Sequence, residues 1–236
     1  MEAAASRHSG NCPAVPQPSA WLGMPLSNAC FISFRHGQQE LTQSFVSQLH
    51  TGLCGEIEAQ LGREVGVFLD EDRLRGGDLF NEAIAEQLWR SSCLVMVYTP
   101  TYFDIRHPYC AREYKAMVKL EEARLRLLGN GPDRTHGLII PIIFRGMNTL
   151  PPEIRDVRHC YDFADFLLTE RKLHKHSKYA GTLKTMAEYI SERHRAISAV
   201  VNDDYVGFRL PPIEEILTWL QGVIPGPVPL PGRLND

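Results

Sequence analysis

The chain has no long hydrophobic run. None of its apolar stretches approaches the roughly 20 residues that a membrane-spanning helix needs. The N-terminal residues 1–20 also lack the basic start and apolar centre of a secretory signal. We therefore expect a cytoplasmic protein with no membrane partner.

The sequence also lacks the local motifs of several enzyme classes. It contains no G-x-S-x-G elbow, no H-E-x-x-H motif, no G-x-x-x-x-G-K-[ST] loop and no G-x-G-x-x-G after a strand. These absences argue against α/β-hydrolases, zinc proteases, P-loop nucleotidases and Rossmann dehydrogenases. We find no internal repeat and no heptad pattern, so solenoids and coiled coils are excluded as well.

Neither sign of charge dominates. Lys and Arg number 25 against 28 Asp and Glu, which gives a net charge of −3 and an isoelectric point near 6.3. A protein that binds nucleic acid by neutralising phosphates needs a positive excess, so we expect no nucleic-acid partner.

Metal and disulfide signals are weak. The six cysteines include no C-x-x-C pair, and most lie within apolar or helical patterns. We interpret them as buried, reduced thiols. His174 and His176 lie in a lysine-rich stretch without a cysteine or carboxylate partner, which favours a solvated basic loop. We expect no metal site and no bound cofactor.

What the chain does have is an alternation of strand-like and helix-like patterns. Apolar runs typical of strands cover residues 29–34, 64–69, 93–98, 138–144 and, more weakly, 159–163. Helical patterns lie between and after them, for example an apolar residue at every fourth position from Leu41 to Ile57. This alternation predicts a parallel sheet covered on both faces. Pro141 in the fourth run indicates a bulge or an edge position.

We divide the chain into three parts. Residues 1–27 are rich in Ala, Ser, Pro and Gly and are predicted to be a flexible leader. Residues 28–200 form the folded domain. Residues 201–236 form a C-terminal extension with a short helix, Ile213 to Val223, and a proline-rich tail. The extension either docks a partner or neighbouring protomer, or is a disordered or packed-back tail.

Ligands of such sheets bind beyond the carboxyl ends of the strands. We place Glu113 there, in the first turn of a helix that begins near Pro108 and runs to Leu128. By position alone, the ordinary interpretation is a carboxylate favoured by the helix dipole. Asp70 and Asp72 suggest a phosphoacceptor site, but the acidic pair that such chemistry needs after the first strand is missing.

Several segments, taken together, resemble one family. Phe31–Arg35 is similar to the F-I-S-[YF]-R box of Toll/interleukin-1 receptor (TIR) domains. The spacing of Asp70 to Gly76 resembles the D-x-x-x-x-x-G loop of that family, and Tyr109–Glu113 resembles its W-C-x-x-E block. The resemblance covers residues 29–195 in the correct order. It implies the flavodoxin-like α/β fold: a five-stranded parallel sheet with helices on both faces, followed here by a short extension.

The resemblance also implies a function. In enzymatic TIR domains the glutamate of the last block cleaves NAD⁺ at the nicotinamide–ribose bond, and that role falls on Glu113. The family pattern places the substrate-binding residues along the same crevice. They are Phe34, Arg35, His36, Gly76, Gly77, Asp78, Leu79 and Cys110.

Two of these residues have specific interpretations. Arg35 could meet the pyrophosphate of NAD⁺. Gly76 and Gly77 alone indicate only a loop that needs positive φ. The chain departs from the family at Tyr109, where Trp is common, and at His36, where a second Arg is frequent. These departures bear on substrate contacts.

Two functions stay open at the level of sequence. One is an NAD⁺ glycohydrolase that forms nicotinamide and ADP-ribose or a cyclic ADP-ribose, similar to bacterial TIR effectors of antiphage defence. It would act through self-association and a sensor or activator protein. The alternative is a non-enzymatic adaptor that works through TIR–TIR association alone. Glu113 favours the enzyme, because non-enzymatic TIR domains often lack that glutamate.

Overall fold

The structure is a computed structural model that describes residues 26–36, 40–69, 77–129, 136–166, 173–201 and 207–223. The predicted leader therefore lies outside the described residues up to position 25, as does the proline-rich tail from position 224 onward.

Five parallel strands form one sheet in the order β2-β1-β3-β4-β5. The strands are β1 (Asn28–Phe34), β2 (Gly66–Leu69), β3 (Ser91–Tyr98), β4 (Ile139–Ile143) and β5 (Tyr161–Asp162). This is the order of the flavodoxin-like fold, and the predicted strands are confirmed to within a few residues. β1 and β3 are buried along their whole length because helices cover both faces.

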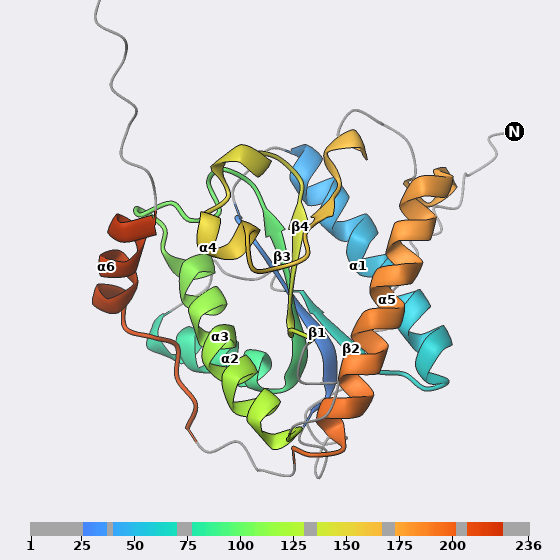
Figure 1. Ribbon diagram of the computed structural model, residues 1–236, viewed down its shortest axis with the longest axis horizontal. Coiled ribbons are helices and arrows are strands. Elements are labelled where there is room, and N and C mark those ends of the chain that lie inside the picture. Colours follow the sequence, from blue (N-terminus) through green and yellow to red (C-terminus); the bar gives the residue numbers. More distant parts are fainter. Residues whose placement is uncertain are drawn as a thin grey trace, which may run out of the picture.

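The helices lie in two layers (Figure 1). The helices are α1 (Glu40–Leu61), α2 (Gly77–Trp89), α3 (Tyr109–Leu127), α4 (Pro152–Arg155), α5 (Ser177–Ser198) and α6 (Ile213–Val223). Helices α1 and α5 pack together on one face of the sheet, and α2 and α3 lie on the other. Helix α6 lies outside α3, so the C-terminal extension returns to the domain.

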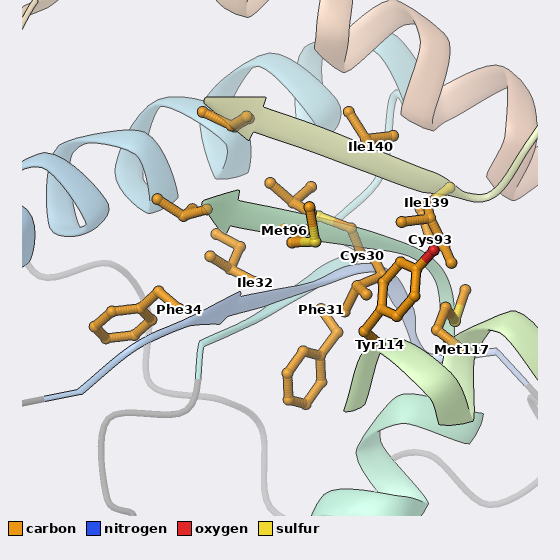
Figure 2. Close-up of a cluster of buried hydrophobic side chains, with 14 of the residues drawn as sticks. Cys30, Phe31, Ile32, Phe34, Cys93, Met96, Tyr114, Met117, Ile139 and Ile140 are labelled. Carbon is orange, nitrogen blue, oxygen red and sulfur yellow. The ribbon is translucent and has the colours of Figure 1, made fainter. Parts of the chain in front are cut away.

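The core is continuous across the sheet. Figure 2 shows Tyr114 and Met117 of α3 beside the strands near Phe31. All three side chains are buried. On the other face, Leu53 and Ile57 of α1 are fully buried, as the four-residue spacing predicts. Leu41, which opens that spacing, is an exception and is 44% exposed.

Pro141 shows how the fourth strand tolerates a proline. It lies opposite Met96 in a ladder with one-for-one register, so the predicted bulge is wrong. β5 pairs only with Ile142 and Ile143. At Pro141 one side of the strand therefore has no partner strand among the described residues, and the position is locally an edge.

Candidate functional site

The site lies where β1 and β3 end. These two strands are neighbours in the sheet. After β1 the chain continues to β2 on one side, and after β3 it continues to β4 on the other side. Ligands of open α/β sheets bind at such a switch point, beyond the carboxyl ends of the strands. Ser33 is the last residue but one of β1. The segment from Thr99 to Pro108 follows β3 and leads into α3.

Three side chains from these segments form a hydrogen-bonded chain, which we call the Glu113 relay: Tyr102, Ser33 and Glu113. The Ser33 hydroxyl donates to Oε2 of Glu113 at 2.6 Å. The Tyr102 hydroxyl lies 2.6 Å from the same Ser33 oxygen. Since Ser33 has one proton and gives it to the carboxylate, Tyr102 must donate to Ser33. The relay fixes one carboxylate oxygen against the end of β1.

Glu113 lies deeper than the sequence indicates. It is the fifth residue of α3, which begins at Tyr109, so it belongs to the second turn and not to the first. The stabilisation by the helix dipole is confined to the first turn, and it applies less to this carboxylate than its predicted position suggested. The side chain is 1% exposed and faces the sheet. Hydrogen bonding from Ser33 thus provides the polar environment that the helix start does not.

Cys110 lies one turn before Glu113 on the same face of α3. Its thiol donates to the carbonyl oxygen of Phe34, with sulfur and oxygen 3.3 Å apart. Cys110 is fully buried. The two contacts, Cys110 to Phe34 and Glu113 to Ser33, join α3 to consecutive residues of β1.

The residues after β1 form a second part of the site. Phe34 and His36 bring their rings together, with centroids 4.1 Å apart. The Arg35 guanidinium turns back and donates to the carbonyl oxygen of His36 at 2.9 Å. Its Nε is buried and has no hydrogen-bond partner among the described residues. Arg35 and His36 are half-buried, so both stand between core and surface.

The loop after β2, residues 70–76, lies outside the described residues, and with it Asp70 and Gly76. Gly77, Asp78 and Leu79 open α2, but their side chains are also outside the described part. α2 begins at Gly77, so Asp78 lies inside the helix.

Arg112, the residue before Glu113, is buried. It is 7% exposed. Its Nε donates to the carbonyl oxygen of Pro211 at 2.8 Å, and another guanidinium nitrogen donates to Asn81 Oδ1 at 3.0 Å. Desolvation lowers the pKa of Arg112. The residue before Glu113 is thus tied both to α2 and to the C-terminal extension.

Other features of the described residues bear on ligands and partners. No group of three or more His, Cys, Asp or Glu side chains is arranged there to hold a metal ion. No helix within the described ranges is long and apolar enough to cross a membrane. Five of the six cysteines lie in the described part, and all five are free thiols.

Reasoning from sequence missed two members of the Glu113 relay. Ser33 lies inside the segment that carried the family resemblance, yet no role was assigned to it. Its signal is a hydroxyl within the otherwise apolar run of residues 29–34, where every residue is buried, so this polar group requires a partner. Tyr102 gave no comparable signal, since aromatic residues are frequent in loops that pack on a core.

The comparisons with known proteins agree with this geometry. The family model described as TIR domain matches residues 30–175, which is more than half of the chain. No curated protein and no solved structure gives a significant match. The chain belongs to the TIR domain family.

Proposed function

We propose that this protein is an NAD⁺ glycohydrolase that cleaves the bond between nicotinamide and ribose. One observation carries the proposal: Glu113, to which the family resemblance gives the catalytic role, accepts a hydrogen bond from Ser33 at the switch point of the sheet. A carboxylate with one oxygen fixed is preorganised to stabilise a positive charge that develops beside it.

The reaction suits a single carboxylate. When the glycosidic bond breaks, its electron pair goes to the nicotinamide nitrogen, and the cationic ring leaves as a neutral molecule. No acid is needed to protonate it. The ribose acquires oxocarbenium character, which the Glu113 carboxylate stabilises. Attack of water at the same carbon and loss of a proton give ADP-ribose, whereas attack by the adenine gives a cyclic product.

Residues at the end of β1 are suited to hold the rest of the substrate. Arg35 would release the His36 carbonyl and pair with the pyrophosphate, since guanidinium binds phosphate oxygens well. Phe34 and His36 would line the crevice, and the family resemblance assigns Gly76, Gly77, Asp78 and Leu79 to the loop that shapes it. Cys110 would support the base of the crevice beneath Glu113.

The burial of Glu113 indicates how the activity would be controlled. A carboxylate that is 1% exposed must become accessible before it can meet a ribose. We propose that self-association through TIR domains, driven by a sensor or activator, provides this opening. Turnover per protein molecule should then rise with protein concentration. This control suits a cytoplasmic effector of bacterial antiphage immunity, which depletes NAD⁺ only after infection is detected.

The alternative is a TIR adaptor without turnover. The observation that favours it is the same burial, because a carboxylate bonded to Ser33 also satisfies a purely structural role. An adaptor would assemble and signal equally well with Glu113→Ala, and would leave NAD⁺ intact at every concentration.

The test is to incubate purified protein with NAD⁺ across a wide concentration series and follow its loss. Wild type should consume NAD⁺ with a rate that rises faster than protein concentration. Glu113→Ala should not consume it, although it should assemble to the same extent by light scattering. Loss of NAD⁺ that is the same in both proteins would reject the proposal.

A further inference from the structure

The part of the chain beyond the family match returns to the helix that carries Glu113. The match ends at residue 175, and α6 occupies residues 213–223. Helix α6 buries Ile216 and Leu220 and lies along the outer side of α3 (Figure 1). The segment before it, which contains Pro211, is also joined to α3 through Arg112.

Three aromatic rings join α6 to the Glu113 relay. Trp219 of α6 stacks on Tyr114, with centroids 5.7 Å apart and ring planes 16° apart. Phe103 contacts both rings edge-on, at 5.4 Å from Trp219 and 5.7 Å from Tyr114. Tyr114 directly follows Glu113, and Phe103 directly follows Tyr102. Trp219 therefore touches the chain neighbours of both outer members of the relay.

Trp219 is itself held in place. Its Nε1–H donates to Oε1 of Glu153 in α4 at 2.8 Å. The Lys115 ammonium lies 4.9 Å from the indole centroid, within the range of a cation–π contact. An aromatic ring held by a hydrogen bond and a cation has little freedom to rotate, so it can fix the rings that pack on it.

The start of α3, which follows Pro108, has no side-chain cap among the described residues. The side chains that flank Glu113 are instead tied to the C-terminal extension: Arg112 to the Pro211 carbonyl and Tyr114 to Trp219. The carboxylate lies between two attachments to one segment.

We propose that Trp219 is a positioning residue for Glu113: through Tyr114 and Phe103 it holds the carboxylate and Tyr102 in register with Ser33. The kinetic part of this inference rests on the proposed NAD⁺ cleavage, whereas the positioning itself does not. If Trp219 only packs, its removal lowers stability and leaves the geometry around Glu113 unchanged. If it positions, its removal loosens residues 102–117 locally and slows the chemical step.

The experiment compares Trp219→Ala and Trp219→Phe with a matched control, Lys119→Ala, in the full chain. Lys119 pairs with Glu215 across the same helix interface at 3.1 Å, but on its exposed side and away from the relay. Two quantities are measured: amide hydrogen exchange of peptides covering residues 102–117, and kcat and KM for NAD⁺ well below the unfolding temperature.

In Trp219→Ala we expect faster exchange in residues 102–117 without a rise in the strands. We also expect kcat to fall by about 10- to 100-fold, with KM within about threefold of wild type, because misplacement by an ångström acts on the chemical step. Trp219→Phe keeps an aromatic ring in the stack. Its amide exchange in residues 102–117 and its kcat should therefore be close to those of wild type. Lys119→Ala should match wild type.

Unchanged exchange in Trp219→Ala would overturn the inference, whether or not wild type cleaves NAD⁺. If wild type is inactive, the proposed function fails while the exchange result still decides the positioning role. Should Trp219→Ala not fold, Glu153→Ala takes its place, since it frees the indole nitrogen and leaves the ring. Faster exchange confined to residues 102–117 would then support the inference. Exchange unchanged from wild type in those residues would overturn it.

Discussion

The hydroxyl of Ser33 donates a 2.6 Å hydrogen bond to Oε2 of Glu113, a residue 80 positions later in the chain. The bond joins strand β1 to helix α3, and both partners are buried. A hydrogen bond to a charged group contributes about 1.5–3 kcal/mol, roughly twice as much as a bond between neutral groups. It both stabilises the fold and sets the direction of the carboxylate.

Ser33→Ala should therefore slow NAD⁺ cleavage by about tenfold and lower the free energy of unfolding by about 2 kcal/mol. The substitution removes the Ser33 hydroxyl as a donor to the carboxylate and as an acceptor for the Tyr102 hydroxyl. Steady-state kinetics and denaturant unfolding measure the two effects.

A matched control is Ser92→Ala. Ser92 is also a fully buried serine of the sheet, but it lies near the amino end of β3, whereas Ser33 lies near the carboxyl end of β1. The Ser92 hydroxyl is hydrogen-bonded to His194 at 2.8 Å. It should lose stability to a similar extent and keep the rate of wild type. Equal loss of rate in both variants would show that the Ser33 effect is a general consequence of destabilisation.

Tyr102→Phe tests the outer member of the relay. Removing the hydroxyl deprives Ser33 of a donor while the ring stays in the core, so we expect a loss of about 1 kcal/mol in stability and about threefold in rate. Tyr98→Phe is the control, because the Tyr98 hydroxyl donates to the Thr149 carbonyl at 2.7 Å, and the substitution keeps the ring that lies 6.2 Å from the ring of Tyr102. It should change stability alone.

Combining Tyr102→Phe with Ser33→Ala provides a second check. Because both act through the same carboxylate, the double variant should be little slower than Ser33→Ala. Fully additive losses in the logarithm of the rate would contradict the relay.

His194 predicts a pH dependence of stability that is separate from the site. Burial is the main cause that lowers its pKa to about 4, and the charges of Arg63 and Arg195 add to it. In the unfolded chain the ordinary pKa is about 6.5. Below about pH 6.5 the imidazole is protonated in the unfolded state but not in the native state. The contribution of His194 to stability is therefore fully present above about pH 6.5 and is lost as the pH falls toward 4.

The loss amounts to about 3 kcal/mol from this residue, from a pKa difference of roughly 2.5 units. Denaturant unfolding of wild type and His194→Gln at pH 7 and pH 4.5 measures it. The variant should be less stable than wild type at pH 7 but lose less on acidification. An equal loss in both proteins would contradict the assignment.

The elements of the fold could be read from the sequence because each has a clear apolar pattern. The eight residues of β3 are continuously buried, and α6 begins and ends at the predicted residues, Ile213 and Val223. The start of the helix that carries Glu113 was predicted for the same reason, since an apolar strand and Pro108 mark the two sides of the preceding loop. Glu113 itself lies in the second turn of that helix and not in the predicted first turn.

The burial of Glu113 could not be predicted from the apolar patterns. Whether Glu113 faces solvent or the sheet depends on the start of α3, and one residue there moves a side chain by about 100° around the helix. The partners of Arg112 and Tyr114, which are Pro211 and Trp219, lie about a hundred positions away. No local pattern indicates contacts at that separation.

Release of nicotinamide by Glu113→Gln tests the central claim most directly. The amide keeps the size of the side chain and an oxygen that can accept from Ser33, and removes only the negative charge. Nicotinamide formed from NAD⁺ at high protein concentration is measured by chromatography for both proteins. The account predicts release by wild type and a rate lower by about 100-fold or more in the variant, because the charge that stabilises the transition state is gone. Equal release by both proteins, with the fold intact, would contradict it.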